Sequence, residues 1–288
     1  MGPWVYMNGE LIPREQAHIH IYDHGFLYGD GAFDTCRVYH GKVFKLKEHV
    51  DRLFRSAIAL LIKMPYTRED IENAVLELVK RNEVGDGYIR ITLTRGVGLG
   101  LDPIKFENTP PTIVITTDEL ALYPESAYQT GLDMVTVSTR VPSPDALDTR
   151  VKSLGHYVAN IQAKYEANRV GAGEGLMLNS QGHVAEATGD NVFIIRKGKI
   201  LTPHPSCGIL QGVTRDTVIE LARSKGFEVE ETILTLMDFY WADECFLTGT
   251  AAEVIPVVKI DGRQIGSGKP GPVTKELIEA FRALTRGL

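Results

Sequence analysis

The chain has 288 residues, enough for one large domain or two moderate ones with an ample hydrophobic core. Hydrophobic residues make up 43% and charged residues 24%, a composition typical of a soluble globular protein. The net charge is −6 and the Lys and Arg residues do not cluster. This argues against a nucleic-acid partner, because phosphate backbones are bound by clustered cations.

The chain shows no signal for a membrane or for export. No apolar run is long enough to span a bilayer, and the start, Met1-Gly2-Pro3-Trp4, lacks a basic segment followed by an apolar one. The three cysteines, Cys36, Cys207 and Cys245, have no paired spacing. We therefore expect a reducing, cytoplasmic setting.

The first part of the chain alternates short strands with helices, which predicts a smaller N-terminal α+β domain over residues 1–117. The Asn8-Gly9 turn supplies the positive φ angles that a tight hairpin needs. Thr67 is expected to cap a helix together with Asp70, three residues on. The expected elements are hairpins of 4–7 with 10–12 and of 32–39 with 42–44, helices at 47–62 and after Thr67, and strands at 88–94 and 112–117.

Residues 118–130 have little apolar periodicity and contain Pro124, so we interpret them as an interdomain linker. Residues 131–288 are expected to form a larger C-terminal α/β domain. The helix expected at 154–168 carries Val158, Ile161 and Tyr165 on one face, predicted to be core, with Lys164 and Glu166 on a solvated face. The remaining expected elements are strands at 134–138, 176–178, 192–195, 200–201, 244–247 and 254–260, and helices at 214–225 and 273–284.

Five segments carry polar residues suited to one kind of chemistry. They are Glu48-His49-Val50-Asp51-Arg52-Leu53, the segment 148–157 with Lys152, Glu186-Ala187-Thr188-Gly189-Asp190-Asn191, Leu210-Gln211-Gly212-Val213-Thr214-Arg215 and Thr248-Gly249-Thr250-Ala251-Ala252-Glu253. One amine, one lone acid and several helix-start or turn segments able to hold a phosphate are the parts of a pyridoxal phosphate enzyme.

In this order, over nearly the whole chain, the segments resemble the fold type IV pyridoxal phosphate enzymes, the family of branched-chain and D-amino acid aminotransferases. The resemblance implies an α+β fold of two domains, D-amino acid aminotransferase-like, with the site in the interdomain cleft. It implies pyridoxal 5'-phosphate as the cofactor and at least a homodimer, since such enzymes bring loops of a neighbouring subunit over the site.

Three residues match the groups that hold the cofactor ring. Lys152, in a Lys-Ser-x-x-x-Tyr context, matches the Schiff-base lysine that also shuttles a proton. By itself it would be interpreted as a surface lysine. Tyr157 matches the tyrosine that hydrogen-bonds the phenolic oxygen of the cofactor. Glu186 matches the acid that faces the pyridine nitrogen and keeps it protonated.

The phosphate group needs backbone N–H groups, hydroxyls and a cation. Gly212, Val213 and Thr214 lie at an expected helix start, where unpaired amides and the helix dipole favour an anion. Arg52 resembles the family's phosphate-binding arginine, and Thr250 its second hydroxyl.

The resemblance also implies the substrate residues. In branched-chain enzymes the α-carboxylate is bound by the backbone around Thr250-Ala251 and by a tyrosine that matches Tyr88. Arg90 matches the arginine that receives the side-chain carboxylate of glutamate. Phe33 matches an apolar pocket wall and Tyr28 a polar rim. The implied reaction is transamination of branched-chain L-amino acids with 2-oxoglutarate.

Three features bear on the substrate, and they do not all favour the same class. The loop Gly96-Val97-Gly98-Leu99-Gly100 resembles the branched-chain type and lacks the arginine and histidine of D-amino acid enzymes. Phe33-Asp34-Thr35-Cys36-Arg37 departs from the usual Phe-Glu-Gly pattern, because Thr35 replaces a glycine of the pocket. Asp30 also occurs among D-type relatives.

The alternatives are therefore a D-amino acid or (R)-amine transaminase of the same fold, an aminodeoxychorismate-type lyase, and a non-catalytic protein that has kept the fold. The intact set of Lys152, Tyr157 and Glu186 argues against the last. His18, His20, Asp23 and His24 could suggest a metal site, but no cysteine or second acid cluster completes it, so we expect none.

Overall fold

The computed structural model of the chain describes residues 2–119 and 123–287. Its contacts divide these residues into two compact units. The N-terminal unit holds residues 2–119 and also Val151–Gly155, and the C-terminal unit holds 123–150 and 156–287. The segment that carries Lys152 thus packs with the N-terminal unit, although it follows the predicted linker in the sequence. The domain boundaries given above remain a prediction.

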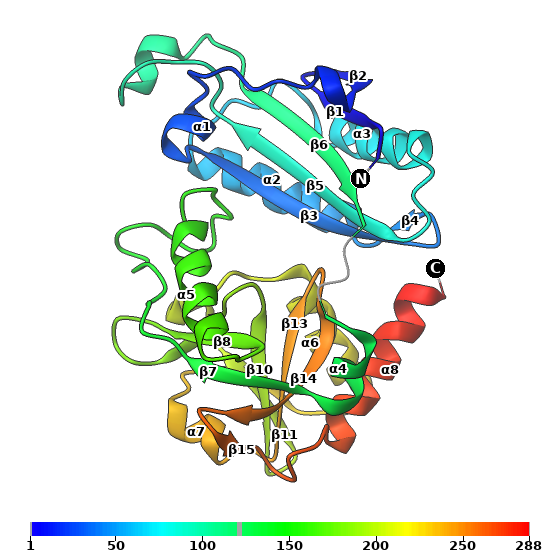
Figure 1. The fold of residues 1–288 in the computed structure, drawn as a ribbon, viewed down its shortest axis with the longest axis vertical. Coiled ribbons are helices and arrows are strands. Elements are labelled where there is room, and N and C mark those ends of the chain that lie inside the picture. The colour runs from blue at the N-terminus through cyan, green and yellow to red at the C-terminus, as the bar shows by residue number, and fades with distance from the viewer. Residues whose placement is uncertain (1, 120–122, 288) are drawn as a thin grey trace. The chain divides into compact units, whose positions relative to one another are not determined.

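The N-terminal unit is built on a six-stranded antiparallel sheet in the order β2-β1-β6-β5-β3-β4 (Figure 1). Its strands are β1 (Trp4–Met7), β2 (Glu10–Pro13), β3 (Gly31–Tyr39), β4 (Lys42–Val43), β5 (Gly87–Thr94) and β6 (Thr112–Asp118). Its helices are α1 (His24–Tyr28), α2 (Leu46–Ala59) and α3 (Arg68–Arg81), with short 3-10 turns η1 (Arg14–Gln16) and η2 (Pro103–Phe106). Both predicted hairpins are confirmed.

The two faces of this sheet have different neighbours. Ile89, Ile91 and Leu93 of β5 are fully buried in one core with Leu53 of α2 and Leu78 of α3. Because side chains alternate along a strand, Tyr88, Arg90 and Thr92 lie on the opposite face and are half-buried. The same alternation in β3 puts Asp34 opposite Ile91 and Thr35 opposite Arg90. The sequence thus sends Asp34 toward α2 and Thr35 away from it.

The C-terminal unit contains a nine-stranded mixed sheet in the order β12-β11-β10-β13-β14-β7-β8-β9, with β15 paired to β14. The strands are β7 (Leu132–Thr136), β8 (Glu174–Leu178), β9 (Val184–Ala187), β10 (Asn191–Arg196), β11 (Lys199–Pro203), β12 (Val229–Thr232), β13 (Glu244–Gly249), β14 (Glu253–Ile260) and β15 (Arg263–Gln264). The β7–β8, β7–β14 and β11–β12 pairs are parallel and the others antiparallel.

Helices pack around this second sheet. Helices α6 and α8 lie against β13 and against each other, and α5 lies against β7 and β8 (Figure 1). Gly226, predicted to be the C-cap of α6, lies one residue beyond it. The C-cap is Lys225, and Gly226 follows with a φ of 86° and an N–H that donates to Arg223 O. The helices are α4 (Glu125–Thr130), α5 (Tyr157–Arg169), α6 (Val213–Ser224), α7 (Leu236–Tyr240) and α8 (Pro272–Arg286), with the turn η3 (Pro205–Cys207).

The prediction for the helix at 154–168 was wrong in two respects. The helix begins at Tyr157, because Leu154 N donates to Gly31 O and Ser153 pairs with Ala32, which holds this stretch extended. Its apolar positions are not core: Val158, Ile161 and Tyr165 are 59%, 68% and 66% exposed.

Part of the stretch interpreted as a linker, residues 118–130, has regular secondary structure. Residues 125–130 form helix α4, while residues 120–122 of the predicted linker lie outside the described residues. Within the described ranges, no helix is long and apolar enough to cross a membrane.

Candidate active site

Arg52 lies in a buried polar cluster at the contact between α2 and β3. Its Nε donates to Asp34 Oδ2 at 2.8 Å and its Nη2 to Asp34 Oδ1 at 2.9 Å. His49, one turn before Arg52 on α2, contacts Asp34 Oδ1 through Nδ1 at 2.7 Å. All three side chains are buried, and Asp34 is fully so. Two points of attachment fix both the position and the plane of the guanidinium.

The cluster decides the charge of its own members. Burial alone would raise the pKa of Asp34, but the charges of Arg52 and His49 and their hydrogen bonds hold it well below its usual range. Burial lowers the pKa of His49, and the nearby cations Arg52 and Lys152 add to this effect against the opposing attraction of Asp34. Near neutral pH His49 is therefore a neutral ring that donates Nδ1–H to an ionised Asp34.

Lys152 is held against β3 and α2 by its backbone. Its N–H donates to Ser56 Oγ at 3.2 Å, and its carbonyl accepts from Phe33 N at 3.0 Å. The residue is only 8% exposed, and Nζ lies 4.8 Å from the centre of the Phe33 ring. The main chain of Lys152 is therefore held in place, and its amine lies beside an aromatic ring.

Phe33 and Arg90 form an apolar wall with a cation over it. The Arg90 guanidinium lies 4.0 Å from the centre of the Phe33 ring, and its Nε donates to Thr92 Oγ1 at 3.2 Å. Thr35 is paired with Arg90 in the strand register and is 5% exposed. The threonine that departs from the family pattern therefore points to the same face as Arg90.

The other two substrate residues of the N-terminal unit lie at its margins. Tyr88 is half-buried and paired with Arg37 in the strand register. Tyr28 ends α1, is 48% exposed, and packs edge-on against the His24 ring at 5.0 Å.

Glu186 is held by donors of the C-terminal unit. It lies on β9, is 9% exposed, and its Oε2 accepts from Leu210 N at 2.9 Å and from Asn191 Nδ2 at 3.1 Å. The same Asn191 amide donates to Leu210 O at 2.8 Å. These bonds keep the carboxylate in one orientation.

The start of α6 lies next to Asn191. Gly212 is its N-cap residue, and a Cβ at Gly212 would lie 2.2 Å from Asn191 Oδ1, so a larger residue there would have to displace the Asn191 amide. Arg215, 1% exposed, donates to Glu231 Oε2 at 2.7 Å and to Pro203 O at 3.2 Å. The helix start is thus tied to the sheet, with the Val213 and Thr214 amides at the positive end of its dipole.

The remaining predicted residues lie at other element ends of the C-terminal unit. Thr250 and Ala251 form the turn after β13 and are half-buried. Gly249, just before them, lies so close to Asp190 that a Cβ there would collide with its carboxylate. Tyr157 is the first residue of α5 and is half-buried.

The structure thus brings the predicted residues together in two groups. Phe33, Arg90 and Lys152 meet in the N-terminal unit, with Arg52 on the helix that Lys152 contacts. Asn191 joins Glu186 to the start of α6 in the C-terminal unit. Sequence reasoning assigned no role to four residues that organise these groups, which are Asp34, His49, Asn191 and Arg215.

These groups fit a phosphorylated pyridine cofactor. A fixed guanidinium and a helix start suit a phosphate, and an oriented buried carboxylate suits a protonated pyridine nitrogen. A metal is not suggested, since no group of three or more His, Cys, Asp or Glu residues among the described ones could hold an ion.

The family model for class IV amino-transferases matches residues 31–260. The chain belongs to this family. A protein of Methanocaldococcus jannaschii, provisionally named a branched-chain-amino-acid aminotransferase, is 46% identical over 279 residues, which cover 96% of this chain and 95% of that protein. The expected class of enzyme is confirmed.

Solved aminotransferases of this family have the same fold. The branched-chain amino acid aminotransferase of Escherichia coli superposes with a TM-score of 0.96 at 32% identity, covering 100% of this chain and 96% of that one. The branched-chain amino acid aminotransferase of Thermobaculum terrenum, solved in its PLP-bound holo-form, gives a TM-score of 0.89 at 32% identity, covering 99% and 94%. The fold type IV prediction is therefore confirmed.

Proposed function

We propose that the chain transfers amino groups between branched-chain L-amino acids and 2-oxoglutarate with pyridoxal 5'-phosphate. The observation that carries this proposal is the Arg90 guanidinium 4.0 Å over the Phe33 ring. The two half-reactions need one pocket that accepts first an aliphatic side chain and then the side-chain carboxylate of glutamate. An aromatic wall with a cation over it offers both. The names of the relatives and of the solved structures agree with this substrate class.

Each proposed cofactor residue has its own task. Bound pyridoxal phosphate supplies an electron sink for the Cα–H bond of an amino acid. Arg52, the Gly212, Val213 and Thr214 segment and the Thr250 hydroxyl bind its phosphate. Glu186 faces the pyridine nitrogen and holds the proton there, and the Tyr157 hydroxyl donates to the phenolic oxygen.

Lys152 is the catalytic residue and moves the proton. Its Nζ takes the proton from the substrate Cα and returns one at the end of each half-reaction. The Lys152 N–H donates to Ser56 Oγ and its carbonyl accepts from Phe33 N, and these bonds keep the main chain in place while Nζ moves. The chain itself thus supplies a base on a rigid support.

The substrate is oriented at both ends. Tyr88 and the backbone at Thr250 and Ala251 bind the α-carboxylate. Phe33 contacts the aliphatic side chain, Arg90 receives the distal carboxylate of glutamate, and Tyr28 forms the polar rim.

Transfer from D-amino acids or (R)-amines is the second candidate, and Thr35 is the observation that favours it. Thr35 is buried and paired with Arg90 in the strand register, so a threonine side chain stands where the branched-chain family has glycine. Rates of amino transfer to 2-oxoglutarate from L-leucine and D-alanine distinguish the two. We expect L-leucine to be the better donor; a faster reaction with D-alanine would contradict the proposal. Ammonia-free release of pyruvate from aminodeoxychorismate, with no 2-oxo acid required, would indicate the lyase instead.

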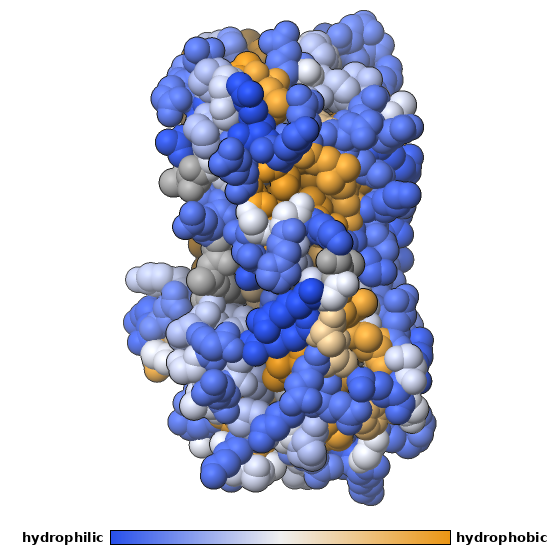
Figure 2. Space-filling model, turned by 90° about the vertical axis from the view of Figure 1, so that its right-hand side faces the viewer, coloured by the Kyte–Doolittle hydropathy of each residue, from blue (hydrophilic) through white to orange (hydrophobic). Residues whose placement is uncertain are grey.

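The chain is further proposed to act as a homodimer or a higher homo-oligomer. Residues 19–28 expose six large hydrophobic side chains within ten positions, an unusual density for a surface bathed in water. The exposed α5 residues Val158, Ile161 and Tyr165 form another such stripe. Figure 2 shows hydrophobic side chains (orange) reaching the surface between hydrophilic ones on one side of the molecule. Sedimentation of wild type and Phe26→Ser tests this, and a monomeric wild type would refute it.

A cytoplasmic location is proposed from the cysteines. Cys36, Cys207 and Cys245 are all buried free thiols, as expected of a protein that stays in a reducing compartment. Recovery of the native protein in the cytoplasmic fraction of its own cells would support this location, and recovery outside the cytoplasm would refute it.

A further inference from the structure

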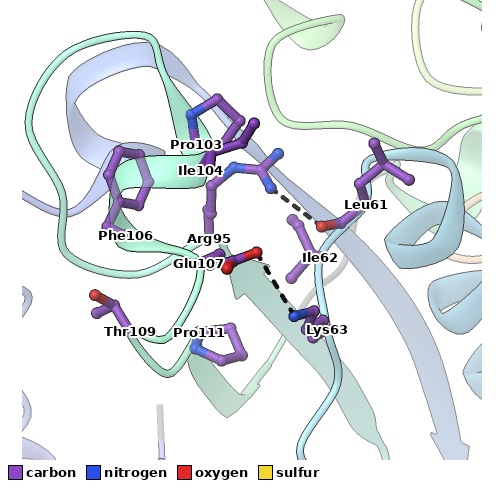
Figure 3. Close-up of a pocket in the computed structure, with 10 residues that line it drawn as sticks. All are labelled: Leu61, Ile62, Lys63, Arg95, Pro103, Ile104, Phe106, Glu107, Thr109 and Pro111. Carbon is purple, nitrogen blue, oxygen red and sulfur yellow. Dashed lines mark hydrogen bonds and ion pairs between the residues drawn. The ribbon is translucent and has the colours of Figure 1, made fainter.

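A second pocket lies in the N-terminal unit, between the end of α2 and the loop of residues 95–111 (Figure 3). Its volume is about 230 Å³, and none of the residues that line it is a proposed cofactor or substrate residue. The walls are apolar, with Ile62 on one side and Ile104, Phe106 and Pro111 on the other. Lys63 and Glu107 stand beside these walls.

The charges around the pocket differ in how firmly they are held. Arg95 also lines it, but its guanidinium pairs with Asp30 at 2.5 Å and donates to the carbonyls of Leu60 and Leu61. Lys63 Nζ and Glu107 Oε2 are 4.0 Å apart, and their side chains are 80% and 54% exposed. Such a loose surface pair exchanges partners readily, so both charges can be offered to a ligand.

We propose that this pocket binds a free α-amino acid with an apolar side chain. An α-ammonium and an α-carboxylate sit on one carbon, close enough together to pair with Glu107 and Lys63 at the same time. The apolar side chain would then lie between Ile62, Ile104 and Phe106. The volume agrees with this class, since it is below the about 300–1,000 Å³ of pockets for drug-sized ligands. A simple carboxylic acid would leave Glu107 without a counter-charge.

Phe106 connects this pocket to segments implicated in substrate binding. A Cβ at Gly98 would lie 2.7 Å from Phe106 Cδ2, so the ring rests directly on the backbone of the loop at residues 96–100. The Phe106 ring also contacts the His24 ring, at 4.5 Å between centroids, and His24 packs edge-on against Tyr28. A ligand that presses on Phe106 therefore acts on that loop and on α1. This coupling, unlike the pocket itself, rests on the substrate role proposed for Tyr28 and on the resemblance of the loop to the branched-chain type.

The test uses α-methyl-leucine as the probe, because it has no Cα hydrogen and cannot be transaminated. The pocket variant is the double substitution Lys63→Met with Glu107→Gln. The matched control is Lys105→Met with Asp102→Asn, which removes a pair of similar length, 3.9 Å, from the same loop but outside the pocket. Asn at position 102 can still accept the hydrogen bond from Ile104 N.

Calorimetric titration of the holoenzyme should show one more equivalent of probe per chain in wild type and control than in the pocket variant. Equal stoichiometry in all three proteins would overturn the proposal. This comparison does not depend on how the catalytic site treats the probe, so it stays informative if the proposed reaction is wrong. 4-Methylvalerate and isopentylamine should bind the pocket at least tenfold more weakly than the zwitterion; equal binding of either would overturn the amino-acid assignment.

The coupling has its own readout. Probe bound in the pocket should change the KM for the amino donor in wild type and control. The change should occur at probe concentrations near the Kd of the pocket, and it should disappear in the pocket variant. Basal kcat should be the same in all three proteins, because Lys63 and Glu107 lie outside the proposed catalytic groups. An unchanged KM at full pocket occupancy would refute the coupling.

Discussion

Asp34 and Arg52 form a buried ion pair with two hydrogen bonds, from Nε at 2.8 Å and from Nη2 at 2.9 Å. Strand β3 supplies the acid and helix α2 the base, so the pair also joins the sheet to the helix. Because these bonds use Nε and Nη2, they set the plane in which Nη1 is presented. The arginine proposed to bind phosphate is thus positioned by an acid that differs from the usual glutamate of the family.

Replacing Asp34 by Asn should destabilise the apoprotein and weaken cofactor binding. Removing one partner of a buried ion pair leaves an uncompensated charge and costs about 3–5 kcal/mol. Urea unfolding and the Kd for pyridoxal phosphate measure the two effects. Asp51→Asn is the matched control on the same helix, since Asp51 pairs with Arg68 on the surface and its loss should cost less than about 1 kcal/mol. Similar losses in the two variants would contradict the positioning role.

The same cluster predicts how stability depends on pH. The folded-state pKa of His49 is lowered, so the unfolded chain binds more protons below the ordinary histidine pKa of about 6.5. Stability from His49 is therefore present above that pH and is lost as the pH falls through the folded pKa. Asp34, whose pKa is also lowered, adds a second loss below about pH 4.

Urea unfolding at pH 7.5 and pH 5.5 measures the histidine part. A single proton contributes at most about 1.4 kcal/mol per pH unit. His49→Gln should flatten the dependence in this range, while His40→Gln, at an exposed turn, should leave it unchanged. A His49→Gln profile that superposes on wild type would refute the assignment.

Arg90→Met should separate the two half-reactions. The loss of a hydrogen bond to a charged group costs about 1.5–3 kcal/mol, or roughly 10- to 150-fold. We expect kcat/KM for 2-oxoglutarate to fall by this factor and that for L-leucine to stay within about threefold, because Phe33 still supplies the apolar wall. Equal losses for both substrates would mean that Arg90 is structural.

Lys152→Ala should abolish transamination and leave the fold intact. General-base catalysis alone contributes about 10²–10⁴-fold, so steady-state rates should fall by at least that much. Lys47→Ala, at an exposed position of α2, is the control and should retain full activity. Turnover by the Lys152→Ala enzyme would exclude the proposed mechanism.

Local chemistry was sufficient to predict much of the fold. The capping box is confirmed: Thr67 N donates to Asp70 Oδ2 and Asp70 N to Thr67 Oγ1. The Asn8-Gly9 turn has the positive φ angles that its residues favour. These features depend on residues next to each other in the chain, and the sequence contains all of them.

The wrong predictions concern residues whose structure depends on contacts with segments far away in the sequence. Helix α5 begins late because residue 154 pairs with Gly31, more than a hundred positions away. Glu166, predicted to be solvated, accepts bonds from Ser138 and Thr139, and Lys164 donates to Glu174. These partners are brought close only by the fold, and no periodicity reveals them.

The site shows the same division. The resemblance predicted Lys152, Glu186 and Arg52. It assigned no role to Asp34, which stands at a position where the family usually has glutamate. Alternation along β3 could have suggested that Asp34 faces α2, since Phe33 and Thr35 belong to the other face. Whether His49 and Arg52 contact Asp34 depends on how α2 packs against the sheet. Neither the sequence of β3 nor that of α2 determines this packing by itself.

The absorption spectrum of the purified holoenzyme, before and after separate additions of L-leucine, L-glutamate and D-alanine, tests the central claim most directly. We predict a yellow protein whose absorption band is bleached to that of the pyridoxamine form by both L-leucine and L-glutamate. Bleaching by D-alanine alone would contradict the branched-chain assignment. It would mean that Thr35, and not the glycine loop, indicates the substrate class. A colourless protein unable to take up pyridoxal phosphate would contradict the account as a whole.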